Sequence, residues 1–404
     1  MTHEIDLTDP IARANPYAIY AQLRREAPIA RVRIKSLGTI WVLSRYDDVA
    51  QAFRDHRLLN DRSAALGQTK PRDKWWLPSI MKAFETSMIM QDEPHHRRLR
   101  SLVHQAFTPR MVEQLSTRIT EVAHKLLDDL QKRDSADLIE SYALPLPLVI
   151  ISEMMGVPEK DQPVFRTLIE GFTEPKRTLG AIAKTAGKMV RLTQFFKKLV
   201  KLRQTEPGDD LTSRLLQAKA EGHAQLSHDE IVAMLLLLLF AGHETTVNLI
   251  ASGTLALLEH PDQFALLREK PELIGSAVEE LLRYTSPAEH SAPRYVSEDI
   301  VYHGITIPKR TAILPLVASA NRDDDVFTNA EKLDITRNPN RHVAFGAGVH
   351  FCLGAPLARL EGKIAMLALV ERFPNLRLSV PKESLTWRQA PGLRALDKLP
   401  LDVT

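Results

Sequence analysis

One cysteine in this 404-residue chain stands in a glycine-rich stretch that suits metal ligation. Cys352 follows Gly346 and Gly348 and precedes Gly354 and Pro356 in the run FGAGVHFCLGAP. Glycine allows a tight loop with positive φ angles, and proline is accommodated in the first turn of a helix. The pattern therefore predicts a cysteine at a helix N-terminus, where orphan N–H groups and the helix dipole favour the thiolate. A thiolate is the form in which a cysteine ligates iron.

A buried structural cysteine is the alternative, since free cysteine is among the most buried residue types. A core cysteine does not need two glycines and an aromatic residue just before it, so the loop favours a ligand. Two other motifs are incomplete. The Gly-Ala-Gly run at 346–348 lacks the third glycine of a dinucleotide-binding loop, because position 351 is Phe. His243-Glu244 lacks the second histidine of a zinc-protease helix, because position 247 is Val.

An acid and an alcohol, Glu244 and Thr245, stand in the middle of a long apolar segment. Ser227 followed by Glu230 is a capping box, and the helix that it opens is predicted over residues 231–259, ending before Pro261. Residues 234–240 are apolar nearly all round, which predicts burial. Polar groups in a core are costly unless they are used or hydrogen-bonded. The alternative to a chemical role is a helix kink with a satisfied Glu–Thr pair.

The rest of the chain predicts a mainly helical protein with a smaller β portion, an α+β fold. Helical periodicity covers nearly all of 94–285 and returns over 353–373, after shorter helices at 16–27 and 47–53. Strand-like runs make the parts at about 29–45 and 292–318 rich in β-structure. Residues 60–90 are irregular and residues 320–351 are rich in loops. We see no repeat or long linker, so we expect a single domain over 1–404.

Composition limits the function classes. Lys and Arg number 53 against 50 Asp and Glu, a formal net charge of +3, which argues against broad nucleic-acid binding. A single cysteine permits no intramolecular disulfide, which fits a reducing compartment. The first ten residues do not form a signal peptide, and the longest apolar run, 231–241, is shorter than the ~20 residues that span a bilayer. We therefore expect a soluble cytoplasmic protein that does not bind membranes.

The stretch 345–354 resembles the haem-binding loop of the cytochrome P450 family, Phe-x-x-Gly-x-x-x-Cys-x-Gly. Three more motifs follow the order of that family: EPHHRRLR at 93–100, AGHETT at 241–246 and ELLR at 280–283. The likeness covers about residues 10–403 and is greatest to the soluble bacterial type. It implies the P450 fold, a triangular prism with haem between the long central helix and the cysteine-bearing helix.

The resemblance assigns roles to individual residues. Cys352 would ligate the iron of haem b (iron protoporphyrin IX), and Phe345, Gly346 and Ala241 would contact the cofactor. Thr245 would hydrogen-bond the bound oxygen and Glu244 would relay protons. The propionates would be bound by His96, Arg100, Arg294 and His350. Without the family, residues 96–100 would be a solvated basic helix face.

The Glu280–Arg283 pair has a structural role in the family. Without the family, it would be interpreted as an exposed ion pair that contributes little to stability. The family often adds a second arginine to this pair, and the expected position holds Lys332, which keeps the charge but loses the forked geometry. Two more departures are Asp324, where proline is usual, and Arg310, where glycine is usual.

The resemblance implies a monooxygenase that uses O2 to hydroxylate or epoxidise an apolar small molecule. Because this length leaves no room for a flavin domain, electrons would come from a ferredoxin or flavodoxin with its NAD(P)H-dependent reductase. Arg97, Arg98 and Arg359 are candidate docking charges, and we expect a monomer. Two alternatives remain: a peroxygenase or decarboxylase on the same haem, and a non-enzymatic haem-binding sensor.

The substrate pocket is expected to be mostly apolar. Leu237, Phe240 and Ala241 share a face of the long helix. Ala288 and His290 follow the Glu–Arg helix, and Trp76, Phe84 and Ile89 lie in the irregular early segment. Each of these residues taken singly is more often core than pocket. Such a site fits a terpenoid, steroid, fatty acid or macrolide-like substrate. His290 or Glu289 would orient a polar end.

Overall fold

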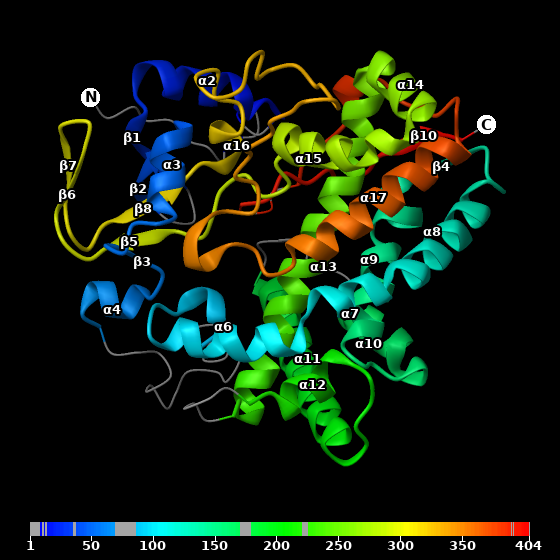
Figure 1. Cartoon of the computed structure of the whole chain (residues 1–404), viewed down its shortest axis with the longest axis horizontal. Helices are drawn as coiled ribbons and strands as arrows, with labels where there is room; N and C mark the ends of the chain where they lie inside the picture. The colour runs from blue at the N-terminus through cyan, green and yellow to red at the C-terminus, as the bar shows by residue number, and fades with distance from the viewer. Residues whose placement is uncertain are drawn as a thin grey trace. The chain divides into compact units, whose positions relative to one another are not determined.

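The computed structural model describes residues 9, 12, 14–34, 38–68, 86–169, 179–219, 225–388, 390 and 392–403. The chain forms two compact units (Figure 1). Unit 1 comprises Met1–Leu59, Thr120–Leu144 and Thr245–Thr404, and unit 2 comprises Asn60–Ile119 and Pro145–Glu244. Helices dominate both units and the described strands lie in unit 1, which confirms the expected α+β class.

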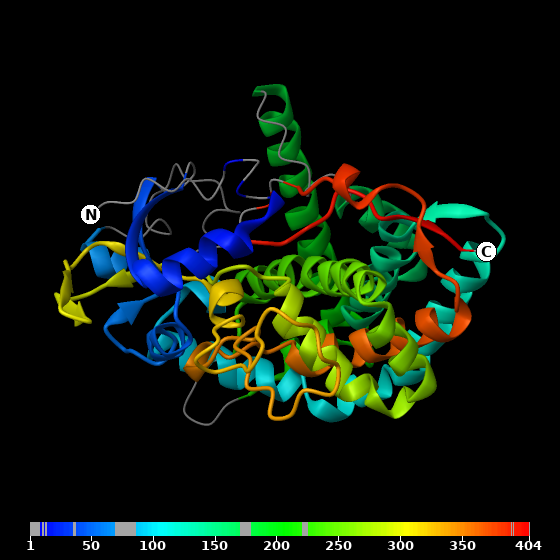
Figure 2. The ribbon, with the colours of Figure 1, turned by 90° about the horizontal axis from the view of Figure 1, so that it is seen from above.

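The main sheet of unit 1 joins strands from both ends of the chain. Its order is β1-β2-β8-β5-β3, with β2 and β8 parallel and the other pairs antiparallel. Figure 2 shows the N-terminal strands (blue) beside the later ones (yellow). The predicted strand regions are confirmed by β1 Ile29–Ile34, β2 Gly38–Leu43, β5 Arg294–Val296 and β8 Ala312–Pro315, whereas β3 Leu58–Leu59 was not predicted. The hairpin β6–β7 (Ile300–Tyr302, Ile305–Ile307) follows β5 in sequence.

Helices pack around this sheet and around one another in unit 1. Gly362 of α17 lies so close to its neighbours that an added Cβ would approach Leu249 Cδ2 to 2.9 Å and Val278 Cγ1 to 3.3 Å. This close approach packs α17 against the end of α13 and against α15. The helices, several of which were predicted, are α2 Pro16–Glu26, α3 Tyr46–Ala52, α14 Pro261–Glu269, α15 Ile274–Thr285, α16 Val317–Ala320 and α17 Ala355–Arg372.

Unit 2 is helical. Within it α10 packs on α11, α11 on α12, and α12 on α6. Its described helices are α4 Arg62–Leu66, α6 His95–Ala106, α7 Pro109–Gln114, α9 Pro145–Met154, α10 Gln162–Ile169, α11 Leu179–Thr205 and α12 Leu211–Gln217. Two helices contribute residues to both units, α8 Ser116–Leu130 and α13 His228–Glu259.

The predicted start of the long helix is confirmed in α13. Ser227 N–H donates to a carboxylate oxygen of Glu230 at 2.8 Å, and the Glu230 N–H donates to Ser227 Oγ at 3.3 Å. By length and composition α13 is the one described helix that could cross a membrane, yet 56% of its most apolar window is buried inside the protein. Packing therefore accounts for its apolar character.

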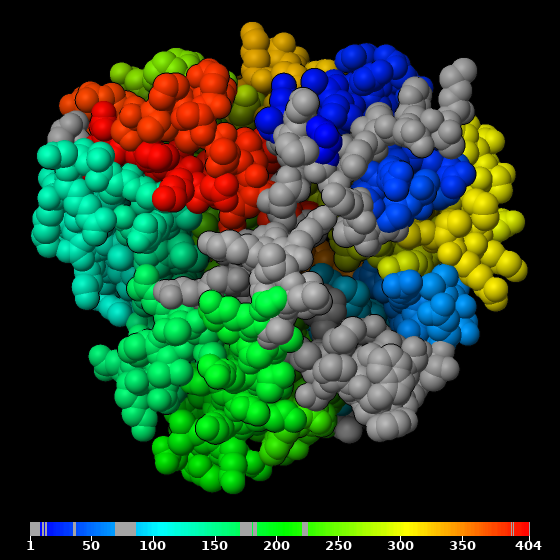
Figure 3. Space-filling model, turned by 180° about the vertical axis from the view of Figure 1, so that it is seen from behind, coloured from blue at the N-terminus to red at the C-terminus, as the bar shows by residue number. Residues whose placement is uncertain are grey.

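The helix-rich stretch 94–285 contains one described strand, at residues 135–137, which the sequence did not predict. Strand β4 (Ser135–Asp137) pairs with β10 (Pro400–Asp402), which also pairs with β9 (Arg377–Leu378). The Asp137 carboxylate accepts the amides of Ile139 and Leu399 at 3.0 and 2.9 Å, and a π-helical turn, Ile139–Ala143, follows. Figure 3 shows the C-terminal residues (red) on the surface of unit 1. A partner more than 250 residues away leaves no local signal in a three-residue strand.

Candidate functional site

The loop before Cys352 is closed by a backbone hydrogen bond. The Cys352 N–H donates to the carbonyl oxygen of Phe345 at 2.9 Å, and a single 3₁₀ turn, Gly348–His350, lies between them. The Ala355 N–H donates to the Cys352 carbonyl at 3.4 Å, and α17 begins at Ala355 with Pro356 in its first turn. The half-buried thiol thus lies just before a helix N-terminus, as the sequence predicted.

Two glycines give this loop its path. Gly346 and Gly348 have φ angles of 69° and 70°, in the left-handed region that favours glycine. A Cβ on Gly348 would lie 2.6 Å from the carbonyl oxygen of Phe53, which is main chain and cannot move aside cheaply. The loop therefore lies directly on the chain that leaves α3.

The predicted propionate partners come from both units. In unit 1, Arg294 opens β5 with 6% of its surface exposed, and its guanidinium carbon lies 5.6 Å from the centre of the Phe53 ring. His350 is half-buried in the cysteine loop. In unit 2, His96 is buried and Arg100 half-buried one turn apart on α6, so the predicted shared face is confirmed.

The acid–alcohol segment lies in the unbroken helix α13. Glu244 and Thr245 are half-buried and Ala241 is exposed, whereas Met234, Leu235, Leu236 and Leu239 of the run predicted to be buried are buried. Gly242 packs closely in unit 2, because an added Cβ would approach Ile151 Cδ1 to 2.9 Å. The glycine therefore serves close packing.

A buried acid that the sequence analysis missed lies near this segment in unit 1. Glu361 of α17 is 2% exposed and is hydrogen-bonded to Thr246, the residue after Thr245. Burial raises the pKa of Glu361 to about 8, and the hydrogen bond with Thr246 offsets only part of that rise. The acid is therefore mainly protonated at neutral pH. A carboxyl among the apolar residues of the last helix was the available signal.

The Glu280–Arg283 pair is the centre of a buried network. Arg283 Nε and Nη2 each donate to a different Glu280 oxygen at 2.8 Å, and both side chains are fully buried. Arg283 also donates to three carbonyls of the following loop, those of Asn321, Ala330 and Lys332. The alternative of an exposed surface pair is therefore excluded, and the pair lies in the core.

The assignment of the second cation to Lys332 is wrong. Arg337 Nε donates to Glu280 at 3.1 Å, whereas Lys332 supplies its carbonyl to Arg283. The arginine fork is therefore present, five residues later than expected. The other departures are accommodated locally. Asp324 accepts the Ala330 amide at 3.3 Å, and Arg310 adopts the left-handed φ of 64° that would suit glycine.

The three candidate docking arginines all have acidic partners. Arg98 donates to both oxygens of Glu230 at 2.6 and 3.2 Å, and Arg359 donates to both oxygens of Glu279 at 2.7 and 2.8 Å. Arg97 pairs with Glu93 one turn earlier on the exposed face of α6. The charge of each guanidinium is thus compensated within its own unit.

The predicted pocket residues are distributed as follows. Trp76 and Phe84 lie outside the described residues. Leu237, Phe240 and Ile89 in unit 2 are half-buried, as are Ala288 and His290 in unit 1. His290 packs on the C-terminal segment, where a Cβ on Gly392 would approach its Cε1 to 3.0 Å. Glu289 is buried and its main chain bonds to Gly392 and Ala318.

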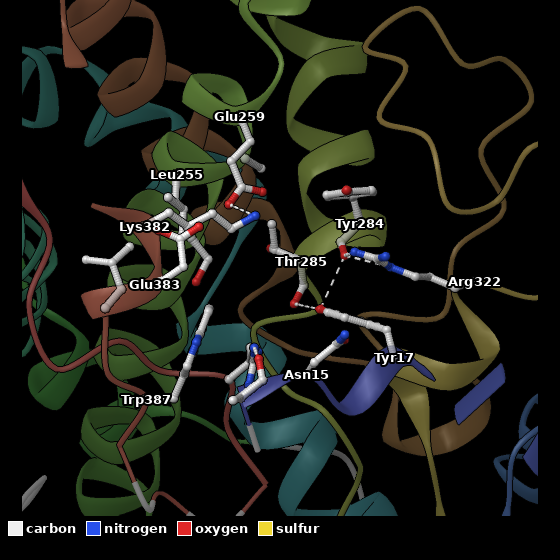
Figure 4. A pocket seen from close by; sticks show the side chains of 15 residues that line it. Asn15, Tyr17, Leu255, Glu259, Tyr284, Thr285, Arg322, Lys382, Glu383 and Trp387 are labelled. Carbon is white, nitrogen blue, oxygen red and sulfur yellow. Dashed lines mark hydrogen bonds and ion pairs between the residues drawn. The ribbon is translucent and has the colours of Figure 1, made fainter. Parts of the chain in front are cut away.

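A separate cavity of about 390 Å³ lies in unit 1 (Figure 4). It is bordered by the C-terminal half of α13, the end of α15 and the C-terminal segment. Lys382 and Glu259 form an ion pair at 2.7 Å on one side, and the Tyr17 hydroxyl donates to the Thr285 carbonyl on the other. None of the predicted site residues lines this cavity, so we do not assign the reaction to it.

The donor set of unit 1 fits a haem. Cys352 offers one soft ligand on a loop whose path is locked by hydrogen bonding and by Gly348. Arg294 is a nearly buried cation, and buried guanidinium groups suit carboxylates such as propionates. The part of the chain that the structure describes contains no cluster of three or more His, Cys, Asp and Glu residues that could hold a bare metal ion.

Comparison with known proteins identifies the same family across nearly the whole chain. The family model described as Cytochrome P450 matches residues 10–387. The polyketide biosynthesis cytochrome P450 PksS of Bacillus subtilis (strain 168) is 42% identical over 393 residues, which cover 96% of each chain. A solved structure of PksS matches with a TM-score of 0.92 and 41% identity, covering 100% of both chains.

Two further matches extend the comparison. Vitamin D(3) 25-hydroxylase of Pseudonocardia autotrophica is 42% identical over 400 residues, covering 99% of this chain and 96% of the relative. A structure of P450BioI in complex with an acyl carrier protein ligated to hexadec-9Z-enoic acid matches with a TM-score of 0.88 and 36% identity. That match covers 98% of this chain and 99% of the other.

Proposed function

Because this chain belongs to the cytochrome P450 family and is a monooxygenase of that family, we propose that it holds haem b and oxygenates an apolar small molecule. The observation that carries the proposal is the loop of Cys352, whose thiol is presented by a closed turn just before α17. Bound haem would supply the activation of O2, a reaction that side chains alone do not perform. We further propose one haem domain, which is monomeric and cytoplasmic.

Five residues would hold the cofactor. Cys352 would be the iron ligand, and the other four residues would bind the cofactor through charge and hydrogen bonds. Arg294 and His350 of unit 1 and His96 and Arg100 of unit 2 would bind the propionates, because guanidinium and imidazole groups suit carboxylates. The burial of Arg294 and His96 supports this assignment, since water would otherwise compete for their hydrogen bonds. Phe345, Gly346 and Ala241 would form apolar and backbone contacts.

Protons would reach the reaction through Glu244 and Thr245. The Thr245 hydroxyl would donate a hydrogen bond through Oγ1, and the Glu244 carboxyl would take up protons from water and pass them on. The presence of this acid and alcohol favours an O2-dependent reaction over a peroxide-dependent one.

The substrate would be a largely apolar molecule of moderate size, such as a polyketide, steroid, terpenoid or fatty acid. Half-buried Leu237 and Phe240 on α13 and Ala288 after α15 would form apolar walls, together with Ala241 and Ile89. His290 would orient a polar end. The names of the relatives, which include a vitamin D(3) hydroxylase and a complex with a fatty-acyl carrier protein, support this class.

Electrons would come from a ferredoxin or flavodoxin with its NAD(P)H-dependent reductase. All three candidate arginines pair with acids, and Arg97, which is 72% exposed against 21% for Arg98 and 34% for Arg359, keeps the most accessible charge for docking.

The function is tested with purified protein, surrogate redox partners and a panel of apolar substrates under ¹⁸O₂. Substrates are first ranked by the haem spin-state shift that they cause. We expect one ¹⁸O atom in each product and no product without NAD(P)H. Product formed only with added peroxide, without label from ¹⁸O₂, would establish a peroxygenase instead.

A further inference from the structure

Arg359, on the second turn of α17, has its guanidinium held in one place. Its Nε and Nη2 donate to the two oxygens of Glu279 at 2.7 and 2.8 Å, and its Cζ lies 4.6 Å from the centre of the Phe345 ring. A forked pair that also stacks on an aromatic ring fixes the direction of the charge. The side chain is 34% exposed, so its position does not come from burial alone.

Glu279, on α15, is held from a second side by His342. The Ala344 N–H donates to His342 Nδ1 at 3.2 Å, so Nε2 carries the hydrogen and donates to Glu279 at 3.1 Å. Burial alone would raise the pKa of Glu279, but the hydrogen bonds from Arg359 and His342 lower it to about 2. The carboxylate therefore stays charged at every pH at which the enzyme would work.

Phe345 connects this pair to the cysteine. Its ring lies under the Arg359 guanidinium, and its carbonyl oxygen accepts the Cys352 amide at 2.9 Å. The hydrogen bond with Glu279 is the main reason that the pKa of Arg359 is raised, and the charge of Cys352 adds to it. Arg359 is thus within electrostatic reach of the thiolate, although neither Arg359 nor Glu279 is part of the predicted ligand set.

We propose that Arg359 and Glu279 set the reduction potential of the haem iron through Cys352, Arg359 raising the potential and Glu279 lowering it. This inference rests on the proposed ligation of haem by Cys352. The reduced state carries one more electron, so a fixed positive charge nearby favours it and a fixed negative charge opposes it. Both are positioning residues, because they act through the cysteine.

A purely structural pair that joins α15 to α17 is the competing account. Ion pairs as exposed as this one, 34% and 26%, contribute little to stability. A purely structural role predicts that removal of either partner changes the reduction potential in the same direction or leaves it unchanged. An electrostatic role predicts shifts of opposite sign.

The test is a mediated redox titration of the holoenzyme at low ionic strength, without protein partners or turnover. Arg359→Gln should lower the midpoint potential and Glu279→Gln should raise it. The double variant should return close to wild type. Arg359→Lys keeps the charge without the fork, so it should stay nearer to wild type than Arg359→Gln does. The shifts of midpoint potential in both directions should become smaller as salt is added, because mobile ions screen the charges.

Arg372→Gln is the matched control. Arg372 is the last residue of the same helix, about 20 Å along the helix axis from Arg359. Its guanidinium pairs with the Asp128 carboxylate at 2.5 Å. This variant removes the same charge and should leave the potential unchanged. Equal shifts in Arg359→Gln, Glu279→Gln and Arg372→Gln, shifts of one sign at Arg359 and Glu279, or no shifts would overturn the inference.

The carbon-monoxide spectrum of the reduced wild-type protein tests the proposed ligation of haem by Cys352 separately from the role of Arg359 and Glu279. A thiolate-type Soret band without opposite shifts overturns the role of the pair and leaves the proposed ligation intact. Absence of that band overturns both.

Discussion

The carbonyl oxygen of Phe53 lies where it would meet a Cβ on Gly348 at 2.6 Å. We predict that Gly348→Ala moves the cysteine loop off α3 and lowers the haem content of purified protein severalfold. Gly346→Ala is the matched control, because Gly346 has nearly the same φ but its nearest neighbour, Phe53 Cε1, would lie 4.0 Å away. It should cost only the backbone strain, roughly 1 kcal/mol. Haem per protein, measured by pyridine haemochrome, checks this; equal losses in both variants would contradict it.

The buried ion pair on α15 gives the second prediction. Arg283→Lys keeps the charge but cannot fill the bonds to Glu280 and to three loop carbonyls. We expect a loss of about 3–5 kcal/mol in unfolding free energy, because a buried partner loses its compensation. Chemical denaturation measures it. Arg372→Lys, at a half-exposed pair, should change stability by at most about 1 kcal/mol. A similar small loss at Arg283 would contradict the network.

The third prediction concerns the hydroxyl of Thr245. Thr245→Ala should still consume electrons from NAD(P)H, but a larger share of them should end in peroxide instead of product. The reason is that no hydroxyl is left to donate a hydrogen bond at that position. Thr245→Ser should restore most of the coupling. The measurement is product formed per NAD(P)H oxidised. Coupling in the alanine variant as tight as in wild type would remove the proposed role.

Glu361 gives the fourth prediction, through its pKa of about 8. Between its unfolded pKa of 4.5 and about 8, the folded protein binds more protons than the unfolded chain, so the Glu361 contribution makes stability fall as pH rises. Glu361→Gln should remove this fall. Its stability relative to wild type should rise by up to roughly 1.4 kcal/mol per pH unit across that window.

Melting temperatures of both proteins from pH 5 to pH 9 give this comparison. Glu371→Gln, on the exposed side of the same helix, is the control and should follow wild type at every pH. A constant difference between Glu361→Gln and wild type over the whole range would mean that Glu361 is already ionised at low pH.

The sequence predicted the parts of the site that local chemistry specifies. The glycine spacing around Cys352 fixes a loop whose backbone bonds are nearly all local, and the Ser227–Glu230 capping box marks the start of α13 within a few residues. Each of these features depends on residues within about ten positions of one another.

Features that depend on distant contacts were missed. Arg337, rather than Lys332, donates to Glu280. The path of the loop that holds both residues depends on carbonyls hydrogen-bonded to Arg283, among them that of Lys332. The contact of Glu361 with Thr246 joins residues 115 positions apart in sequence.

The most direct measurement is the absorption spectrum of the reduced, carbon-monoxide-bound protein, recorded for wild type, Cys352→Ala and Cys352→His. Ligation of haem iron by Cys352 predicts the red-shifted Soret band of a thiolate complex in wild type alone. The histidine variant should give an imidazole-type band and the alanine variant neither. An imidazole-type band in wild type, or a thiolate-type band that survives in Cys352→Ala, would contradict the account.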